Sequence, residues 1–467
     1  MAWRFLGVQH AWEPLSRLAP DQLPAALIWL APVLAVGLLS PAFCLAAIFA
    51  TITWDRLATF EVAGFTVRVQ YFLAALLWLH GARARLVRGP TDLLPPRLPI
   101  LFPAIAVLAV YAASLAVSTN RPGTAGTTAW GVFQVFGLTT AVVWAVGDDA
   151  WLRQALRWYF RGLLIAGALG VVQLVGGAVW GAAPLWVATD HVYRHVPGIP
   201  RGLPRMVGFS FEPSYFALQM QMGAALAGAL WWRRVRVGAV PEGWLMLIFA
   251  ACAVASLSKA AWLAGLPFLL IVYLVALARA GDRRGRRWPL VAAVGLLAAG
   301  IGWTVHRGHA GKLSTMVAEV FDPAVFQPDR HDGPPTSAMD RFAAIRRSIG
   351  AWRRRPILGW GVRSQHSTVP NLYVESLVET GVIGLAAVIV FVVVYLVALG
   401  RAAVRCPPGS GRPVLGASLW GLFWAGVLGW VLLAPFNQTF FRADLWPLVA
   451  LAMAAWHLRR SAGPNTR

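Results

Sequence analysis

The sequence has little charge for its length, since only 13% of its 467 residues are Asp, Glu, Lys or Arg, while 58% are hydrophobic. A soluble protein of this size needs far more charge on its surface, so a soluble fold is excluded. Apolar runs of about 17–25 residues recur along the chain, the length that crosses a bilayer core about 30 Å thick. Lipid accommodates only helices or closed barrels, and these runs lack the alternation of barrel strands. We therefore expect an all-α polytopic membrane protein.

Acidic residues are also scarce: 19 Asp and Glu stand against 41 Lys and Arg, a net charge of +22. In a soluble protein such an excess would indicate nucleic-acid binding. Here much of it lies in short loops, which the positive-inside rule assigns to the cytoplasm. We therefore expect the lipid bilayer, and no nucleic acid, as a partner. The basic segments assigned to the cytoplasm are 83–88, 152–161, 232–236, 279–287, 401–412 and 459–460.

Cysteine is rare, with Cys44, Cys252 and Cys406 each in or near a different apolar run. We expect no disulfide, and no Cys/His spacing typical of a metal site is present. The sequence also lacks a D-x-D motif or a comparable set of metal-binding carboxylates. These absences favour a site without a metal or another cofactor.

The whole chain, residues 1–467, is predicted to form one integral membrane domain with about 12 spans (11–13). No cleavable signal peptide is apparent, and region 23–54, which contains Pro41, is either one broken span or a tight hairpin. The other spans are predicted near 98–117, 127–147, 162–180, 214–231, 243–258, 260–278, 289–305, 372–400, 413–433 and 445–458. The segments predicted to face outside are 118–126, a first large loop at 182–213, a turn near Lys259, a second large loop at 306–370, and 434–444.

The second large loop precedes the last three spans and contains a helical pattern at 341–355. Four apolar side chains recur there at helical spacing, with arginines on the other face: Phe342, Ile345, Ile349 and Trp352. This pattern predicts an amphipathic helix at the outer membrane surface, acting as a lid or as a docking element for a lipid substrate. Since ten basic residues outnumber five acidic ones between Arg307 and Arg363, we expect an anionic group to be bound there.

Three groups of ionisable residues lie beside apolar spans. Lys259, one of two lysines in the chain, stands between two apolar runs, where a cation is costly and is usually functional. The alternative is that its side chain snorkels from the outer end of a hairpin. Asn371, Glu375 and Glu379 are spaced at i, i+4 and i+8, and therefore share one helix face. That face is either part of a site or merely the polar side of a surface helix.

The third group is the stretch RMVGFSFEPSYFA at 205–217, which places Arg205 and Glu212 before an apolar run. Ser210 or Ser214 could cap the following helix, whose first turn suits a proline. Glu212 could itself have only a structural role there, because the helix dipole favours a carboxylate at the N-terminus. Arg205 opposes that dipole, so we expect it to bind an anion.

In this order the motifs resemble those of the O-antigen ligase and polymerase superfamily. They are R-x-x-G-F-x-x-E-P-S, an S-K pair between two spans, R-P-I-L-G-W-G, and N-L-Y-x-E-x-L-x-E-T-G-x-x-G-L. The similarity covers about residues 100–460. The superfamily includes Wzy-type polysaccharide polymerases, WaaL-type O-antigen ligases and some protein O-oligosaccharyltransferases.

The resemblance implies a GT-C-like, metal-independent glycosyltransferase in the bacterial inner membrane, with its active site facing the periplasm. The implied donor is an oligosaccharide on undecaprenyl pyrophosphate, the partner substrate is an acceptor glycan, and a chain-length regulator is a further possible partner. The superfamily's first-loop arginine matches Arg205, and the arginine that begins the loop helix matches Arg341. The arginine of its S-R pair is replaced by Lys259, which keeps the charge but loses the bidentate geometry of a guanidinium.

The H-N pair of the ligases is missing here, because Pro370 precedes Asn371. This departure and the E-P-S motif favour a polymerase, which would transfer the glycan to the end sugar of another lipid-linked repeat unit. The alternatives are a ligase that transfers glycan to lipid A-core or protein and, from another class, a flippase for lipid-linked glycans. A flippase would be expected to show internal repeats, and the motifs at 205–217 and 370–385 are not repeated.

The expected chemistry assigns two roles to the candidate residues. Cations stabilise the negative charge that develops on the departing pyrophosphate, and a base takes the proton of the attacking hydroxyl. The predicted pyrophosphate-binding residues are Arg201, Arg205, Lys259 and Arg341. The candidate bases, in order, are Glu212, His366 and Glu375, whereas Asn371 and Glu379 are expected to bind other parts of the substrate.

Overall fold

A computed structural model describes residues 23–54, 59–62, 65–87, 97–180, 193–194, 203–210, 212–258, 261–265, 267, 269–270, 337–363, 371–406, 411–434, 440 and 445–461. Within these ranges the chain is almost entirely helical, which confirms that the fold is all-α. The α-helices are α3 (Leu23–Leu39), α4 (Pro41–Ala50), α5 (Val69–Leu86), α6 (Leu101–Ser114), α7 (Arg121–Val132), α8 (Thr139–Ala145), α9 (Asp149–Trp180), α11 (Pro213–Trp232), α12 (Glu242–Ala255), α16 (Ser337–Trp352), α17 (Leu372–Val404), α18 (Pro413–Gly426) and α19 (Trp446–Ser461).

Short stretches of other secondary structure interrupt the described helices. The π-helical turns are η2 (Phe133–Leu138), η3 (Ala261–Gly265) and η8 (Val427–Leu432). Two antiparallel hairpins pair β1 (Thr59–Val62) with β2 (Phe65–Arg68), and β3 (Tyr193–Arg194) with β4 (Leu203–Pro204).

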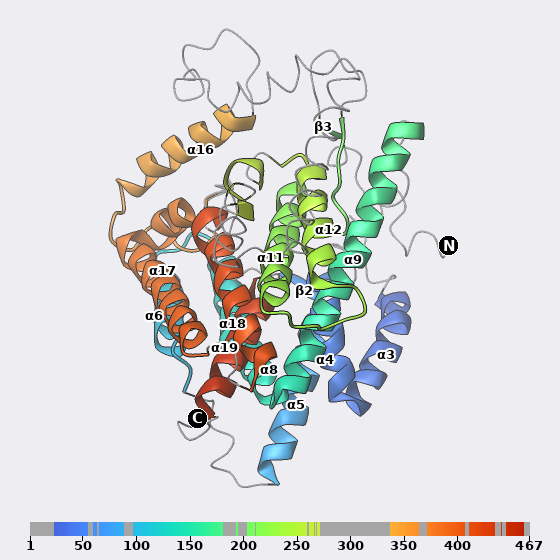
Figure 1. Cartoon of the computed structure of the whole chain (residues 1–467). Helices are drawn as coiled ribbons and strands as arrows, with labels where there is room; N and C mark the ends of the chain where they lie inside the picture. Colours follow the sequence, from blue (N-terminus) through green and yellow to red (C-terminus); the bar gives the residue numbers. More distant parts are fainter. Residues whose placement is uncertain are drawn as a thin grey trace.

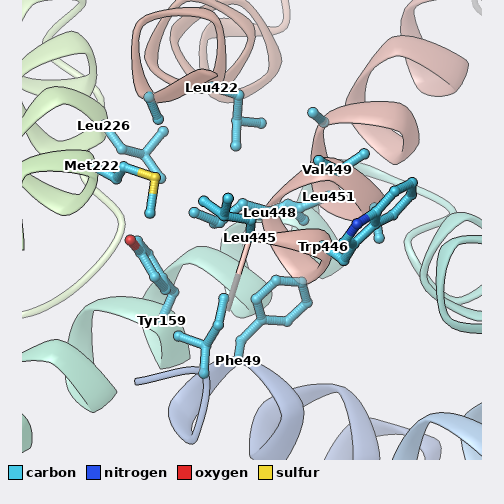
Figure 2. Packing of buried hydrophobic residues seen from close by; sticks show 14 of the residues in the cluster. Phe49, Tyr159, Met222, Leu226, Leu422, Leu445, Trp446, Leu448, Val449 and Leu451 are labelled. Atoms are coloured by element: carbon cyan, nitrogen blue, oxygen red, sulfur yellow. The ribbon is translucent and has the colours of Figure 1, made fainter. Parts of the chain in front are cut away.

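The helices pack side by side into one bundle (Figure 1), with α11 at its centre between α12 and α18. Fourteen of the 20 residues of α11 are buried and none is exposed, because small and apolar residues let its neighbours approach closely on several sides. Most of the described helices contribute to the hydrophobic core. Figure 2 shows part of it, with Phe49 of α4, Tyr159 of α9, Leu226 of α11, Leu422 of α18 and Trp446 of α19.

Several described helices have the length and composition of membrane spans. Four segments are long and apolar enough to cross a bilayer: Arg121–Ala145, Asp149–Gly176, Leu372–Val404 and Pro413–Leu432. Three shorter apolar helices, α4, α6 and α12, accompany them. Helix α11 has the length of a span but carries the buried polar residues Gln219 and Gln221, as suits a helix surrounded by protein rather than lipid. The protein is thus helical and membrane-spanning, whereas the number 12 stays a prediction.

The described parts of the basic segments predicted for the cytoplasm gather at one end of the bundle, which also carries the C-terminus (Figure 1), whereas segment 279–287 lies outside the described residues. Arg153 Nη1 donates to the Arg236 carbonyl at 2.6 Å, and Arg157 Nε donates to the Val237 carbonyl at 3.0 Å. Arg459 reaches the Arg405 carbonyl at 3.2 Å. Two pairs of basic segments that are distant in sequence therefore lie together, 152–161 with 232–236 and 401–412 with 459–460, as one-sided placement requires.

The structure corrects two predicted boundaries and describes a third region whose form the sequence left open. Segment 118–126 is not simply a loop, because α7 begins at Arg121, where the Asn120 side chain accepts from Gly123 N at 3.1 Å. The basic segment 152–161 lies inside α9, which starts earlier because Asp148 Oδ1 accepts from Ala150 N and Trp151 N at 2.8 and 2.9 Å. Region 23–54 contains two helices, α3 and α4, separated by Ser40.

The amphipathic helix is real but shifted: α16 spans Ser337–Trp352 rather than 341–355, and a turn at 353–354 leads to Pro356, which cannot continue a helix. Arg346 and Arg347 are exposed. Ile345, Ile349 and Trp352 of the predicted apolar face are only partly buried, whereas their neighbours Ala344 and Ser348 are buried. Several predicted segments lie outside the described residues: residues 271–278 of the predicted span 260–278, the predicted span 289–305, and residues 182–192, 195–202, 306–336 and 364–370 of the large loops.

Candidate active site

Two groups of predicted site residues lie at the end of the bundle opposite the basic segments. At about 1.5 Å per residue, the 32 residues of α9 span about 48 Å from the basic end at Asp149. Gln173, near the far end of α9, contacts the 205–212 stretch. The second group follows α16 and begins α17, where it contacts the turn between α6 and α7. Arg201, Lys259 and His366 lie outside the described residues, and Arg341 lies within α16.

The backbone of the 205–212 stretch is fixed by Gln173, which the sequence analysis did not identify. Gln173 Oε1 accepts from Val207 N and Gly208 N at 3.2 and 2.9 Å, and Gln173 Nε2 donates to the Gly208 carbonyl at 3.1 Å. Gly208 has a φ of +58°, and a Cβ there would lie 2.8 Å from the Ala166 carbonyl oxygen. The stretch therefore turns at glycine, between Arg205 and Glu212, which are both partly buried.

Glu212 occupies the N-cap position of α11, and Pro213 follows in the first turn as predicted. The expectation that Ser210 or Ser214 caps this helix is wrong, because neither is the N-cap residue and no side chain makes a capping hydrogen bond. Ser214 Oγ instead donates to Glu212 Oε2 at 3.1 Å. The Glu212 carboxylate thus does not satisfy helix N–H groups, which removes the purely structural capping role and leaves the carboxylate available for chemistry.

The polar residues at the start of α17 have different roles in the structure. Asn371 caps the helix, since its Oδ1 accepts from Tyr373 N at 3.0 Å and Val374 N at 3.1 Å. Glu379 is 9% exposed, and its Oε1 accepts from Arg363 N at 2.7 Å. Glu375, one turn earlier, is partly buried.

The R-P-I-L-G-W-G segment pairs with a kink in α17 at Gly381. Gly381 has φ +67° and ψ −167°, so the helix is interrupted there. The interruption lets the Val378 carbonyl accept from Trp360 N at 3.0 Å and the Glu379 carbonyl accept from Gly361 N at 2.8 Å. Val382 N in turn donates to the Pro356 carbonyl at 2.9 Å. The two motifs therefore form one structural unit, although the sequence analysis treated them separately.

Side chains stiffen the same unit. The Arg355 guanidinium lies 4.3 Å from the centre of the Trp360 ring, and its Nη1 donates to the Val117 carbonyl at 3.2 Å. Trp360 Nε1 donates to the Ala351 carbonyl at 2.9 Å. Arg355 is thus held by a ring and a carbonyl, which ties the end of α16 to the end of α6.

Polar residues around the start of α7 complete the site, and the sequence analysis had passed over them as part of a loop. Thr124 Oγ1 donates to the Val362 carbonyl at 2.5 Å, across 238 residues of sequence. Asn120 Nδ2 donates to the Arg363 carbonyl at 3.1 Å, across 243 residues. The signal that could have identified them is the polar run S-T-N-R-P-G-T between two apolar segments.

Gly381→Ala is expected to destabilise the protein by about 2–5 kcal/mol, by adding left-handed backbone strain to a steric clash. A Cβ at Gly381 would lie 2.0 Å from the Ile357 carbonyl oxygen, which is backbone and cannot move aside cheaply. The measurement is the apparent melting temperature of the detergent-solubilised protein. Gly350→Ala is the matched control: nothing lies within 4 Å of a Cβ there, and the helix should gain about 0.5–1 kcal/mol. Equal melting temperatures for the two variants would contradict the role assigned to the kink.

Comparison with known protein families adds an independent finding. Residues 244–389 match the Wzy_C family model, described as O-antigen ligase. The matched range includes α12, α16, the R-P-I-L-G-W-G segment and the kinked start of α17. No curated protein matches the chain.

Proposed function

Because the chain carries a domain of the O-antigen ligase and polymerase superfamily, we propose that it is a polysaccharide polymerase of the bacterial inner membrane. In this proposal it transfers a glycan from undecaprenyl pyrophosphate to the end sugar of another lipid-linked repeat unit, at the periplasmic face and without a metal, in a GT-C-like fold. The observation that carries the proposal is the turn at Gly208. It places the Arg205 cation and the Glu212 carboxylate, which makes no helix-capping hydrogen bond, at the end of the bundle opposite the basic segments.

The chemistry is a displacement at the anomeric carbon of the donor sugar. The acceptor hydroxyl oxygen forms the new bond, the bond to the pyrophosphate oxygen breaks, and the lipid pyrophosphate leaves with the electron pair. Glu212 takes the hydroxyl proton, and Glu375 and His366 are the other candidates for that role. Arg205 stabilises the charge on the leaving pyrophosphate, together with Lys259, Arg201 and Arg341, while Asn371 and Glu379 shape the substrate-binding end of α17.

A ligase that moves finished glycan to lipid A-core or to a protein is the second candidate, since the matching family model is described as O-antigen ligase. The observation that favours the polymerase is Pro370, which stands where the ligases have histidine. A chain-length regulator is proposed as a further partner of the polymerase.

The deciding experiment supplies purified protein in proteoliposomes with a lipid-linked repeat unit alone. A ladder of products supports the polymerase. No product until lipid A-core or a protein acceptor is added indicates the ligase. Movement of the lipid-linked glycan across the bilayer without any new glycosidic bond would indicate a flippase and overturn the proposal.

A further inference from the structure

Arg363 has a backbone conformation that is costly for its residue type. Its φ is +57°, in the left-handed region, and it follows the positive-φ glycines Gly359 and Gly361 in the same turn. For a residue with a side chain this conformation costs roughly 1–2 kcal/mol, whereas glycine adopts it freely. A turn that needed only this backbone shape would therefore be better served by glycine, so the arginine side chain itself calls for an explanation.

The strained residue is clamped at both of its main-chain polar groups. Its N–H donates to the buried carboxylate of Glu379 at 2.7 Å, and its carbonyl accepts from Asn120 Nδ2 at 3.1 Å. Thr124 holds the preceding carbonyl of Val362 at 2.5 Å. Two helices, α17 and α7, thus use side chains to fix the position of one arginine backbone. Burying a carboxylate such as Glu379 costs desolvation free energy, so its use to hold one backbone N–H is unusual.

Within the part of the chain that the structure describes, the Arg363 guanidinium makes no hydrogen bond, and its charge acts on the Glu379 carboxylate. The residue is exposed, and its hydrogen bonds in this region come from its main chain. Arg355, eight residues earlier, provides the contrast, since its guanidinium is held by the Trp360 ring and the Val117 carbonyl. Arg355 therefore has a structural role, whereas Arg363 presents an exposed, positioned cation beside the start of α17 whose side chain is not held by a ring or a carbonyl of the described residues.

We propose that Arg363 is a substrate-binding residue whose guanidinium binds a phosphate of the lipid-linked donor, with Glu379 and Asn120 as the positioning residues that hold it. The inference rests on the proposed function, and it adds to the site a cation that the sequence motifs did not indicate. A planar, always charged guanidinium fits phosphate oxygens with paired hydrogen bonds. Holding the backbone beforehand reduces the entropy lost when the anion binds.

The test uses full-length Arg363→Gly, which removes the cation and relieves the strain. We expect an equal or higher melting temperature and a kcat within about twofold of wild type. The KM for the lipid-linked donor should rise about tenfold, since one charge-assisted hydrogen bond contributes about a factor of ten to binding. Arg363→Asn, another residue that tolerates the left-handed region, should behave alike. Arg363→Lys should recover part of the affinity. Arg354→Gln, which removes an exposed arginine at the end of α16, is the control and should leave KM unchanged.

Binding of sugar-free undecaprenyl pyrophosphate to the same variants separates this inference from the proposed function. Weaker binding by Arg363→Gly, with wild-type protein that yields no polymer, would support the phosphate site while the polymerase assignment fails. Wild-type KM and wild-type binding in both Arg363→Gly and Arg363→Asn would overturn the inference. A fall in melting temperature with unchanged donor affinity would likewise overturn it, because Arg363 would then be only a turn residue.

Discussion

Glu212→Gln is expected to cut turnover by about 100-fold or more while leaving donor binding near the wild-type value, the usual scale for loss of a general base. The amide keeps the size of the side chain and an oxygen that can accept from Ser214 Oγ, which lies 3.1 Å from Glu212 Oε2. Because no backbone N–H of α11 depends on the carboxylate for capping, the fold should be retained. Single-turnover kinetics with lipid-linked repeat units, together with donor binding, measure the two effects separately.

Glu242→Gln is the matched control for this prediction. Glu242 is also a carboxylate at a helix start, but it is 3% exposed and its Oε1 accepts from Val237 N at 2.6 Å at the basic end of the bundle. Its replacement should lower the melting temperature and leave the rate constant of the chemical step nearly unchanged. If Glu212→Gln turns over normally, Glu212 is not the base, and Glu375 and His366 become the variants to test.

Arg205→Ala is expected to reduce product formation by about 100- to 1,000-fold, the range found when one preorganised donor to a developing negative charge is removed. Arg205 precedes a backbone segment that Gln173 and the Ala255 carbonyl fix, so the truncation should not unfold the turn. Lys259→Ala should have a similar effect, whereas Lys259→Arg should retain much activity because it restores the arginine of the superfamily's motif. Gel analysis of the glycan ladder measures the loss, and membrane fractionation checks insertion.

Arg157→Ala is the control that separates the effect of removing Arg205 from the general effect of removing an arginine. Its Nε donates to the Val237 carbonyl at 3.0 Å at the basic end, so its removal should affect stability rather than product formation. A wild-type ladder from Arg205→Ala would remove Arg205 from the phosphate site.

Hydrophobicity and charge alone predicted the helical membrane fold and the grouping of the basic segments, because both depend on transfer free energies that are nearly additive along a sequence. The helix that carries Glu375 and Glu379 was likewise readable from the sequence, and so was the proline in the first turn of α11, but Asn371 is the N-cap of α17 rather than part of its helical face. The order of the motifs also predicted the superfamily, which the match over residues 244–389 supports.

What the sequence did not show is which of these polar groups are already used within the protein. Asn371 is occupied by a helix cap and Glu379 by the N–H of Arg363, whereas Glu212, which could have been only a cap, is not used as one. The partners of the 205–212 stretch and of Arg363 are Gln173 and Asn120, which are 35 and 243 residues away from the groups they bind. Such pairings depend on how helices pack, and neither propensity nor periodicity carries that information. Only the tertiary structure could decide them, because a buried polar group takes whichever partner the packed bundle brings within hydrogen-bonding distance.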